Sequence, residues 1–241
     1  MKYYGDETRH MGEYLSDGVR NFTEAVSRNK PDIVVVLGDR LEALSAALAC
    51  LCLNTPIAHI NGGDVTGGVI DESIRHAITK ISHIHFTFNQ ENAERVKRMG
   101  EEEWRIHVIN PPPLSMQEGR GKRILEGLGL DAGEKTLLVL HHPVTARKDS
   151  GLFELEEVLA AVETLGLQAL VFHPNCDAGG KAFIKKIGES EGEKVRVAGN
   201  LPHGEFTSLM GFVDAVVGNS SSGLLEAPRL GTPAVNVGGR Q

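Results

Sequence analysis

Cysteine is scarce in this 241-residue sequence, which has only Cys50, Cys52 and Cys176. A structural zinc site needs four ligands at short, regular spacings, and three scattered cysteines do not provide them. Cys50 and Cys52 fall in the apolar segment ALSAALACLCL, so we expect both to be small core residues. The carboxylates are too dispersed to specify a magnesium site. No metal site is therefore predicted.

Long apolar runs and long basic runs are also missing. No segment has the length of a membrane span and no secretory leader opens the chain, which favours a cytoplasmic protein. The net charge is −7, so neither nucleic acid nor an anionic membrane is expected as a partner. No GxGxxG motif follows a predicted strand, so a nicotinamide cofactor is not expected and no other cofactor is predicted.

Strand-like and helix-like segments alternate almost throughout the chain. This order predicts an α/β protein with parallel sheets. The proline-rich stretch Asn110–Met116 separates two series and predicts two doubly wound, Rossmann-like domains, 1–114 and 115–241, facing a cleft. The predicted strands are 32–37, 56–60, 83–88, 106–109, 136–140, 168–172, 195–197, 213–217 and 234–237. The predicted helices are 7–28, 41–53, 72–81, 91–99, 152–165, 180–189, 204–210 and 223–229.

The two ends of the sequence are unusual for this architecture. The chain opens on a helix that no strand precedes, and it stops at Gln241 directly after a strand. A doubly wound sheet would normally follow its last strand with a covering helix. We therefore expect a chain that is truncated at both ends, with an incomplete first domain.

Two polar segments follow neighbouring strands of the first domain. Asp39 and Arg40 come directly after 32–37, where Asp39 is either an acid/base group or only the cap of the next helix. Arg40 is placed to bind a phosphate or Asp39. The segment HINGGDVTGGVIDESIRH then gathers ionisable groups in a glycine-rich loop, more than helix capping needs. It predicts an acid/base cluster whose members are His59, Asp64, Asp71, Glu72, Arg75 and His76.

The second domain shows the same arrangement. His141 and His142 end the strand 136–140; His142 is a candidate to protonate a leaving phosphate, and His141 is expected to be exposed to solvent. Asn175 and Asp177 lie between the next strand and its helix. The segment GNLPHGEF follows 195–197. It is a weaker candidate, a loop whose backbone groups could bond to the edge of a nucleotide base.

The segment GNSSSG, Gly218–Gly223, is the most informative of these. It follows an apolar strand and begins a helix, and the free N–H groups of a helix start bind phosphate. Asn219, Ser220 and Ser221 are the candidate ligands, and Glu226, one turn on, is placed to accept hydrogen bonds from a ribose. The simpler interpretation is a serine N-cap on an ordinary helix.

Every one of these segments follows the carboxyl end of a predicted strand. Ligands of open α/β sheets bind at that edge. The common placement predicts a nucleotide or nucleotide-sugar site.

The motifs together resemble a known family from about Pro31 to Gln241. LGDR, HINGGD, IDESIRHAITKISHIHF, HHPVT, HPNCDAGG and GNSSSGLLEAPRLGTPAVNVGGRQ are similar to those of the hydrolysing UDP-N-acetylglucosamine 2-epimerases, which act in the sialic-acid and legionaminic-acid pathways. The resemblance implies a glycosyltransferase-B-type fold and a homo-oligomer. It also implies elimination of UDP through a 2-acetamidoglucal, followed by hydration to a free N-acetylmannosamine-type sugar.

The resemblance also assigns roles to single residues. Asp39 and Asp71 match the acid/base carboxylates, and His142 matches a histidine near the leaving diphosphate. Arg40 matches an arginine of hydrolysing members. Ser220 and Ser221 match phosphate contacts, and Glu226 matches a ribose contact. Arg240 matches an anion-binding arginine. Asn175 and Asp177 match a loop beside the nucleotide.

Three departures from the family pattern leave alternatives open. Asn61 stands where some members carry a glutamate, and Asp64 is the candidate replacement. The loop has one extra glycine at Gly67 and Gly68, and the family's first strand, its basic loop and the segment after Gln241 are absent. The alternatives are a non-catalytic nucleotide-sugar-binding remnant, a non-hydrolysing epimerase, which Arg40 disfavours, and a glycosyltransferase. The base, the number of acetamido groups and a cation on the diphosphate stay open.

Overall fold

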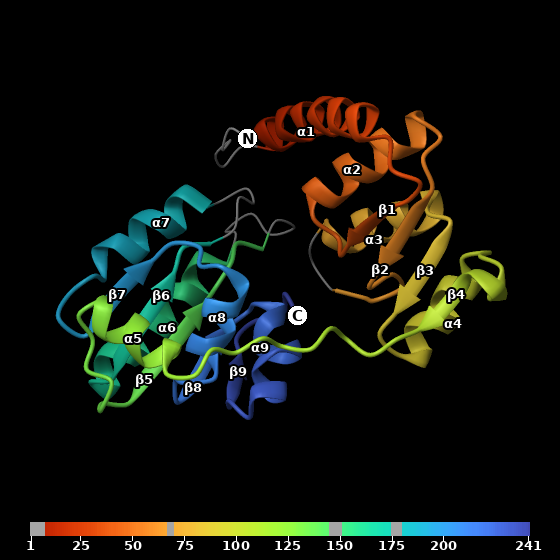
Figure 1. Cartoon of the computed structure of the whole chain (residues 1–241). Helices are drawn as coiled ribbons and strands as arrows, with labels where there is room; N and C mark the ends of the chain where they lie inside the picture. Colours follow the sequence, from red (N-terminus) through yellow and green to blue (C-terminus); the bar gives the residue numbers. More distant parts are fainter. Residues whose placement is uncertain (1–7, 67–69, 145–150, 175–179) are drawn as a thin grey trace. The chain divides into compact units, whose positions relative to one another are not determined.

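The structure is a computed structural model that describes residues 8–66, 70–144, 151–174 and 180–241 (Figure 1). The chain forms two compact units, Met1–Pro112 (unit 1) and Pro113–Gln241 (unit 2), where the sequence predicts a division after residue 114. Each unit contains one parallel sheet with helices between its strands. This confirms the predicted fold class, α/β with two parallel sheets.

In the described part of unit 1, four strands follow one another across the sheet in the order β1-β2-β3-β4. All three strand pairs are parallel, and Val36, His59 and His85 are aligned across the first three strands. The elements are α1 (Thr8–Asn29), β1 (Val34–Leu37), α2 (Leu41–Cys52), β2 (Ile57–Ile60), α3 (Asp71–Ile81), β3 (Ile84–Thr87), α4 (Gln90–Arg98), η1 (Glu103–Arg105) and β4 (Ile106–Val108).

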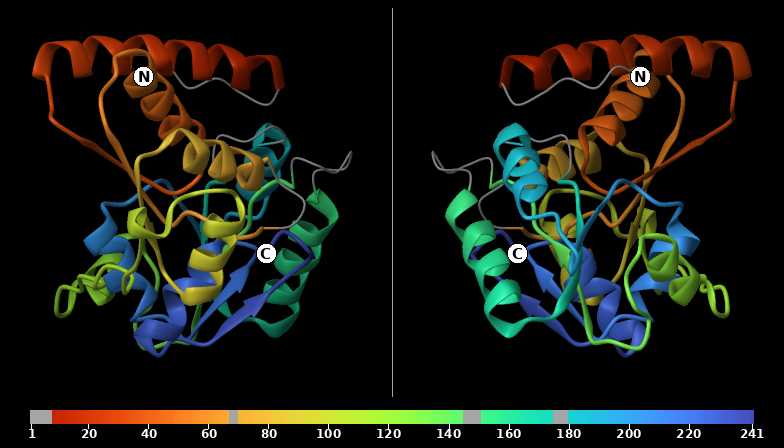
Figure 2. Two further views of the ribbon diagram at one scale, coloured as in Figure 1. Left: turned by 90° about the vertical axis from the view of Figure 1, so that its right-hand side faces the viewer. Right: turned by 90° about the vertical axis from the view of Figure 1, so that its left-hand side faces the viewer.

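One face of the unit 1 sheet carries its core. Val36 and Ile57 of the sheet pack there with Ala47 and Cys50 of α2 and with Ile74 and Ile78 of α3. Helix α1 lies beside α2 (Figure 2), and the Tyr14 hydroxyl donates to Glu42 Oε1 at 2.7 Å. On the opposite face, Val35 and Leu37 of β1 are 60% and 62% exposed.

The residues described for unit 2 include five strands in the order β7-β6-β5-β8-β9, all parallel. The order reverses at β5, the first strand of the unit. Its elements are α5 (Arg120–Gly127), β5 (Thr136–Leu140), α6 (Leu152–Leu165), β6 (Gln168–Phe172), α7 (Gly180–Glu189), β7 (Val195–Ala198), α8 (His203–Met210), β8 (Ala215–Gly218), α9 (Ser221–Leu225), η2 (Ala227–Leu230) and β9 (Ala234–Asn236).

Because crossovers between parallel strands are right-handed, the reversal places helices on both faces of this sheet. Val139 and Val171 pack against α6 and α7 in one core cluster. Leu138 and Leu170 pack against α5 and α8 in the other. All five residues of β6 are buried, as expected for a strand that is covered on both faces.

The strands predicted from the sequence are all present, but three details differ. Helix α5 is not predicted, because its glycines weaken the helical pattern; one of them, Gly121, lets α5 approach α8 so closely that a Cβ would lie 2.4 Å from Ser208 O. The helix predicted over 223–229 is two short pieces, α9 and η2. Cys50 is buried as predicted, but the prediction for Cys52 is wrong, because Cys52 lies exposed at the end of α2.

Two searches of the described residues bear on membranes and metals. No helix there combines enough length and apolar character to cross a bilayer. Within the same residues, no group of three or more His, Cys, Asp or Glu side chains is arranged to hold a metal ion.

Candidate functional site

Asp39 lies at the carboxyl end of β1 and forms an ion pair with Arg75 of α3. The Arg75 side chain is 2% exposed and that of Asp39 21%. The alternative that Asp39 caps α2 is wrong: the N-cap residue is Arg40, and it makes no side-chain cap bond. Because an unpaired buried charge is costly, each of these two groups holds the other in place.

Arg75 also organises the loop that follows β2. Its Nη1 donates to the Asp64 carbonyl oxygen at 2.8 Å and lies 3.4 Å from Thr66 Oγ1. Glu72 Oε2 accepts from Thr66 N at 3.1 Å. The N-cap residue of α3 is Ile70, which makes no side-chain cap bond, so helix capping does not account for Asp71 and Glu72. The buried guanidinium therefore joins Asp39 to the backbone of the loop that follows β2.

The remaining candidates of unit 1 lie on the same loop, at the start of α2 and in α3. Asp71 is the first residue of α3, and the Asp64 carboxylate accepts from Val65 N at 3.0 Å. His76 follows Arg75 on α3, and its Nδ1 is buried without a hydrogen-bond partner. Arg40 Nε lies 3.8 Å from Glu42 Oε2, and it is Arg75, not Arg40, that pairs with Asp39. The alternative in which Arg40 pairs with Asp39 is therefore wrong, and its binding of a phosphate stays a prediction.

In unit 2, Asn219 connects the carboxyl ends of β5 and β8. Its Oδ1 accepts from His142 N at 2.7 Å, its Nδ2 donates to His142 O at 2.8 Å, and its own N donates to Leu140 O at 3.0 Å. Gly218, with φ +140°, precedes it, and a Cβ there would lie 2.1 Å from Leu140 O. Only glycine fits such a close approach. His142 and the GNSSSG segment are thereby fixed side by side at the point where the strand order reverses.

The expectation that His141 is exposed to solvent is wrong. The side chain is 1% exposed, and its ring stacks on Phe183 at a centroid distance of 6.0 Å. Nε2 lies 3.3 Å from Asn219 Nδ2. Burial, with a smaller effect of Arg240, lowers the pKa of His141 to about 4. His141 is therefore a neutral packing residue at neutral pH.

The other predicted nucleotide contacts lie around the same strand ends. Ser220 caps α9, its Oγ accepting from Ser222 N at 3.4 Å, as the simpler interpretation predicted, and Ser221 begins the helix. Glu226 Oε1 lies 2.9 Å from His203 Nε2, a residue of the GNLPHGEF loop that the sequence did not single out. Arg240 is buried, and its Nη1 donates to Asn219 O at 3.3 Å. Asn175 and Asp177 lie outside the described residues.

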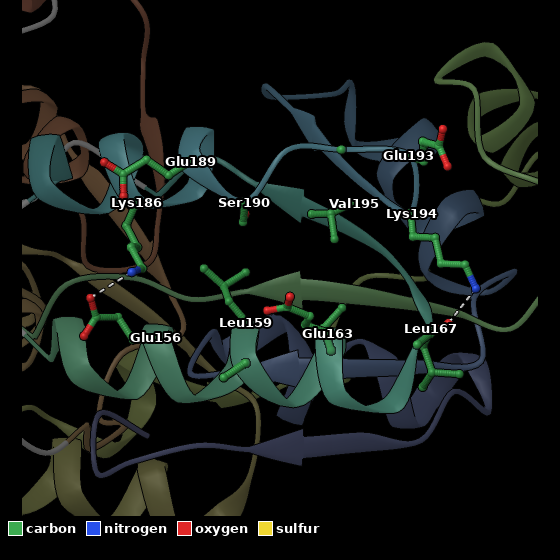
Figure 3. A pocket seen from close by; sticks show the side chains of 14 residues that line it. Glu156, Leu159, Glu163, Leu167, Lys186, Glu189, Ser190, Glu193, Lys194 and Val195 are labelled. Carbon is green, nitrogen blue, oxygen red and sulfur yellow. Dashed lines mark hydrogen bonds and ion pairs between the residues drawn. The ribbon is translucent and has the colours of Figure 1, made fainter.

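A large cavity of unit 2 lies elsewhere. It has a volume of about 550 Å³ and runs between α6 and α7 to the residues that precede β6 and begin β7 (Figure 3). Glu156 and Lys186 form an ion pair of 3.1 Å in its wall. None of the described residues that line it is a candidate site residue. This cavity is therefore separate from the candidate residues of unit 2.

Comparison with known proteins assigns the fold to a family. The model of the UDP-N-acetylglucosamine 2-epimerase family matches residues 3–241. The chain belongs to this family. Its loops after β1, β2, β5 and β8 are thus those of an epimerase family member, and they contain the polar clusters described above.

Two curated relatives of the epimerase family show how far the similarity extends. The chain is 36% identical to a UDP-N,N'-diacetylbacillosamine 2-epimerase (hydrolyzing) of Legionella pneumophila, over 96% of this chain and 62% of the relative. It is 31% identical to a UDP-N-acetylglucosamine 2-epimerase of Neisseria meningitidis, again over 96% of this chain and 62% of the relative. The chain therefore spans about three fifths of the length of these epimerases.

Solved structures show the same fold at lower identity. The structure of S. aureus MnaA with UDP matches with a TM-score of 0.73 and 16% identity, covering 95% of this chain and 65% of that one. The Methanocaldococcus jannaschii UDP-GlcNAc 2-epimerase in complex with UDP-GlcNAc and UDP matches with a TM-score of 0.71 and 19% identity, covering 94% and 65%. These matches confirm the glycosyltransferase-B-type α/β architecture.

Proposed function

We propose that this chain carries the reaction groups of a hydrolysing nucleotide-sugar 2-epimerase. Its substrate would be a UDP-linked 2-acetamido sugar, and its products UDP and the free sugar with inverted C2. The observation that carries the proposal is the Asp39–Arg75 pair at the carboxyl end of β1, because it holds a carboxylate at the sheet edge where ligands of such folds bind. The hydrolysing Legionella relative supports the same reaction.

The reaction divides into an elimination and a hydration. In the first step a base removes the proton from C2, the C1–O bond breaks on the opposite face, and UDP leaves, which creates the C1=C2 double bond of a 2-acetamidoglucal. In the second step water supplies a hydroxyl to C1 and a proton returns to C2 on the other face. Asp39, Asp64 and Asp71 are the proposed acid/base groups, since carboxylates in different surroundings can divide these roles.

Unit 2 would hold the nucleotide. His142 is proposed near the leaving diphosphate, with Ser220, Ser221 and Arg240 as phosphate contacts and Glu226 as a ribose contact that His203 orients. Asn219 would contribute by fixing His142 and the serine segment next to each other. Arg40, Arg75 and His76 complete the set in unit 1, and Asn175 and Asp177 remain predictions.

The test is turnover of this chain in deuterium oxide, with UDP-N-acetylglucosamine and UDP-N,N'-diacetylbacillosamine as substrates. NMR should show UDP, together with a free C2-inverted sugar that carries deuterium at C2. A non-hydrolysing epimerase would keep the inverted sugar linked to UDP, and a plain hydrolase would release sugar without deuterium. Binding of UDP without turnover of either sugar would instead support a non-catalytic role. Asp39→Asn is the control and should abolish release of UDP.

The diacetamido sugar is the second candidate substrate. It is favoured by the higher identity to the Legionella relative, 36% against 31% for the Neisseria relative. A ratio of kcat/KM for the two substrates decides between them.

A further inference from the structure

His59 is a buried histidine that contacts residues next to both members of the Asp39–Arg75 pair. Its Nε2 lies 2.9 Å from the carbonyl oxygen of Gly38, the residue that precedes Asp39. Its Nδ1 lies 3.2 Å from Thr79 Oγ1, and that hydroxyl lies 3.0 Å from the carbonyl oxygen of Arg75. The side chains of His59 and Thr79 are fully buried, so water does not compete for these bonds.

These contacts form a closed circuit that links the end of β1 to β2 and α3. It runs from Asp39 through the Gly38 carbonyl to His59 on β2, on to Thr79 and Arg75 on α3, and back to Asp39 through the ion pair. Gly38 has φ +81°, so the chain turns sharply there before Asp39. A bond to its carbonyl therefore sets the direction in which the Asp39 side chain leaves the strand.

The hydrogen-bond partners of the His59 imidazole also fix its tautomer. A carbonyl oxygen only accepts, so Nε2 carries the hydrogen that bonds to Gly38. Nδ1 is then an acceptor that faces the Thr79 hydroxyl, and it shares the single hydrogen of that hydroxyl with Arg75 O. With both nitrogens engaged inside the protein, His59 has none to offer to a substrate. This argues against the acid/base role that the sequence allowed for it.

We propose that His59 is a positioning residue, whose Nε2–H bond to the Gly38 carbonyl holds Asp39 in the orientation needed for proton transfer. The proposal rests on the epimerase function proposed for this site. It assigns no chemistry to His59 itself. It predicts that the two nitrogens contribute unequally, since only Nε2 is directly linked to the residue before Asp39.

Two conservative variants separate the bonds. His59→Gln places an amide N–H near the position of Nε2 and keeps the Gly38 bond, whereas His59→Asn reaches only the Nδ1 position and keeps the Thr79 bond. We expect kcat to fall about 30-fold in His59→Asn, by analogy with small misplacements of catalytic groups, and less than about threefold in His59→Gln. KM and the Kd for UDP should be unchanged in both variants. Equal losses in the two variants would overturn the proposal.

His85 provides a matched control. It is also fully buried, it is aligned with His59 on the neighbouring strand, and its Nε2 bonds to Glu101 at 3.2 Å instead of to the loop that contains Asp39. His85→Gln and His85→Asn should show no difference in kcat from each other. A difference as large as that at His59 would mean that the effect comes from packing in this row of the sheet, and would contradict the proposal.

A second measurement does not need turnover. The guanidinium ¹⁵N signals of Arg75 should show restricted rotation in the original chain and in His59→Gln, because the ion pair with Asp39 is held there. His59→Asn should average these signals while its unfolding midpoint stays close to that of His59→Gln. Unchanged signals in His59→Asn would overturn the positioning role. A chain that is inactive on every sugar but shows this pattern would count against the proposed function alone.

Discussion

The two sheets of this chain have the same kind of strands but differ in how the chain passes between them. In unit 1 the strands follow one another in chain order, and the core lies on one face, while Val35 and Leu37 on the other face are exposed. In unit 2 the order reverses at β5, and two core clusters cover both faces. Strand order, rather than strand composition, therefore decides how much apolar surface a sheet buries.

The candidate sites are also held together differently. In unit 1 a buried charge pair, Asp39 and Arg75, joins the end of β1 to α3. In unit 2 a neutral amide, Asn219, joins the ends of β5 and β8 through backbone groups of His142 and Leu140. A charge pair is costly to break and strongly oriented, whereas an amide can satisfy a donor and an acceptor at once. The following predictions test this contrast, from the largest effect to the smallest.

Removal of the cation in unit 1 should have the largest effect. In Arg75→Ala, Asp39 loses its partner and the Asp64 carbonyl loses its donor. We expect the free energy of unfolding to fall by about 4 kcal/mol in urea titrations. The control is Glu91→Ala, whose partner pair with Arg95 is largely exposed on the Glu91 side and should cost less than about 0.5 kcal/mol. Similar costs for both variants would show that the buried pair does not hold unit 1 together.

Acid should weaken both units through one buried histidine each. Burial lowers the pKa of His59 to about 4 against the opposing effect of the bond to the Gly38 carbonyl, and His85, Arg75 and His76 lower it further by smaller amounts. Burial also lowers the pKa of His141 to about 4. Between pH 6.5 and 4 the unfolded chain binds protons that the folded chain excludes, so stability is present above this range and is lost as the pH falls. Each histidine should remove about 3 kcal/mol by pH 4.

The measurement is the urea midpoint from pH 7 to pH 4, with hydrogen exchange to separate the units. His141→Gln should reduce the acid-induced loss of hydrogen-exchange protection for the amides of unit 2. The loss of protection in unit 1 should stay unchanged. A pH dependence that survives in both units of a His59→Gln, His141→Gln double variant would assign the acid sensitivity to other groups.

Loss of the amide in unit 2 should cost less than loss of the cation in unit 1. Asn219→Ala removes the amide that bonds to the His142 N–H and carbonyl, which should lower the free energy of unfolding by about 2 kcal/mol. Asn236→Ala, on the exposed strand β9 of the same sheet, is the control and should change it by less than about 0.5 kcal/mol. If Asn219→Ala lowered the free energy of unfolding more than Arg75→Ala does, the amide would contribute more to stability than the charge pair, contrary to this prediction.

The smallest effect is expected for a valine on the open face of unit 1. Val35→Ala on β1, where the side chain is 60% exposed, should lower stability by less than about 0.5 kcal/mol. The same change in unit 2, Val171→Ala on the fully buried strand β6, should cost about 2 kcal/mol. Equal costs would mean that another group covers the face of Val35 in solution.

Much of the fold follows from local pattern. Apolar runs closed by glycine or a polar turn predicted β1 to β9, because the strands of parallel sheets are rich in apolar residues. Helix α5 was not predicted, because Gly121 and Gly127 weaken its helical pattern. Its packing against α8 is a tertiary contact that the local sequence does not show. The exposure of Cys52 was also misjudged, since neighbouring residues of a helix point in different directions.

By itself, the sequence determined the α/β class, the strand ends that carry Asp39, Asp64, His142 and Ser220, and the family, because these depend on the order of residues along the chain. Only the tertiary structure decided which groups meet. Arg75 is 36 residues from Asp39, and Asn219 is 77 residues from His142. Strand order and helix packing bring such distant residues into contact, and the burial that follows lowers the pKa of His59 and His141. Composition and motif spacing contain neither distance nor burial, which are properties of the folded chain.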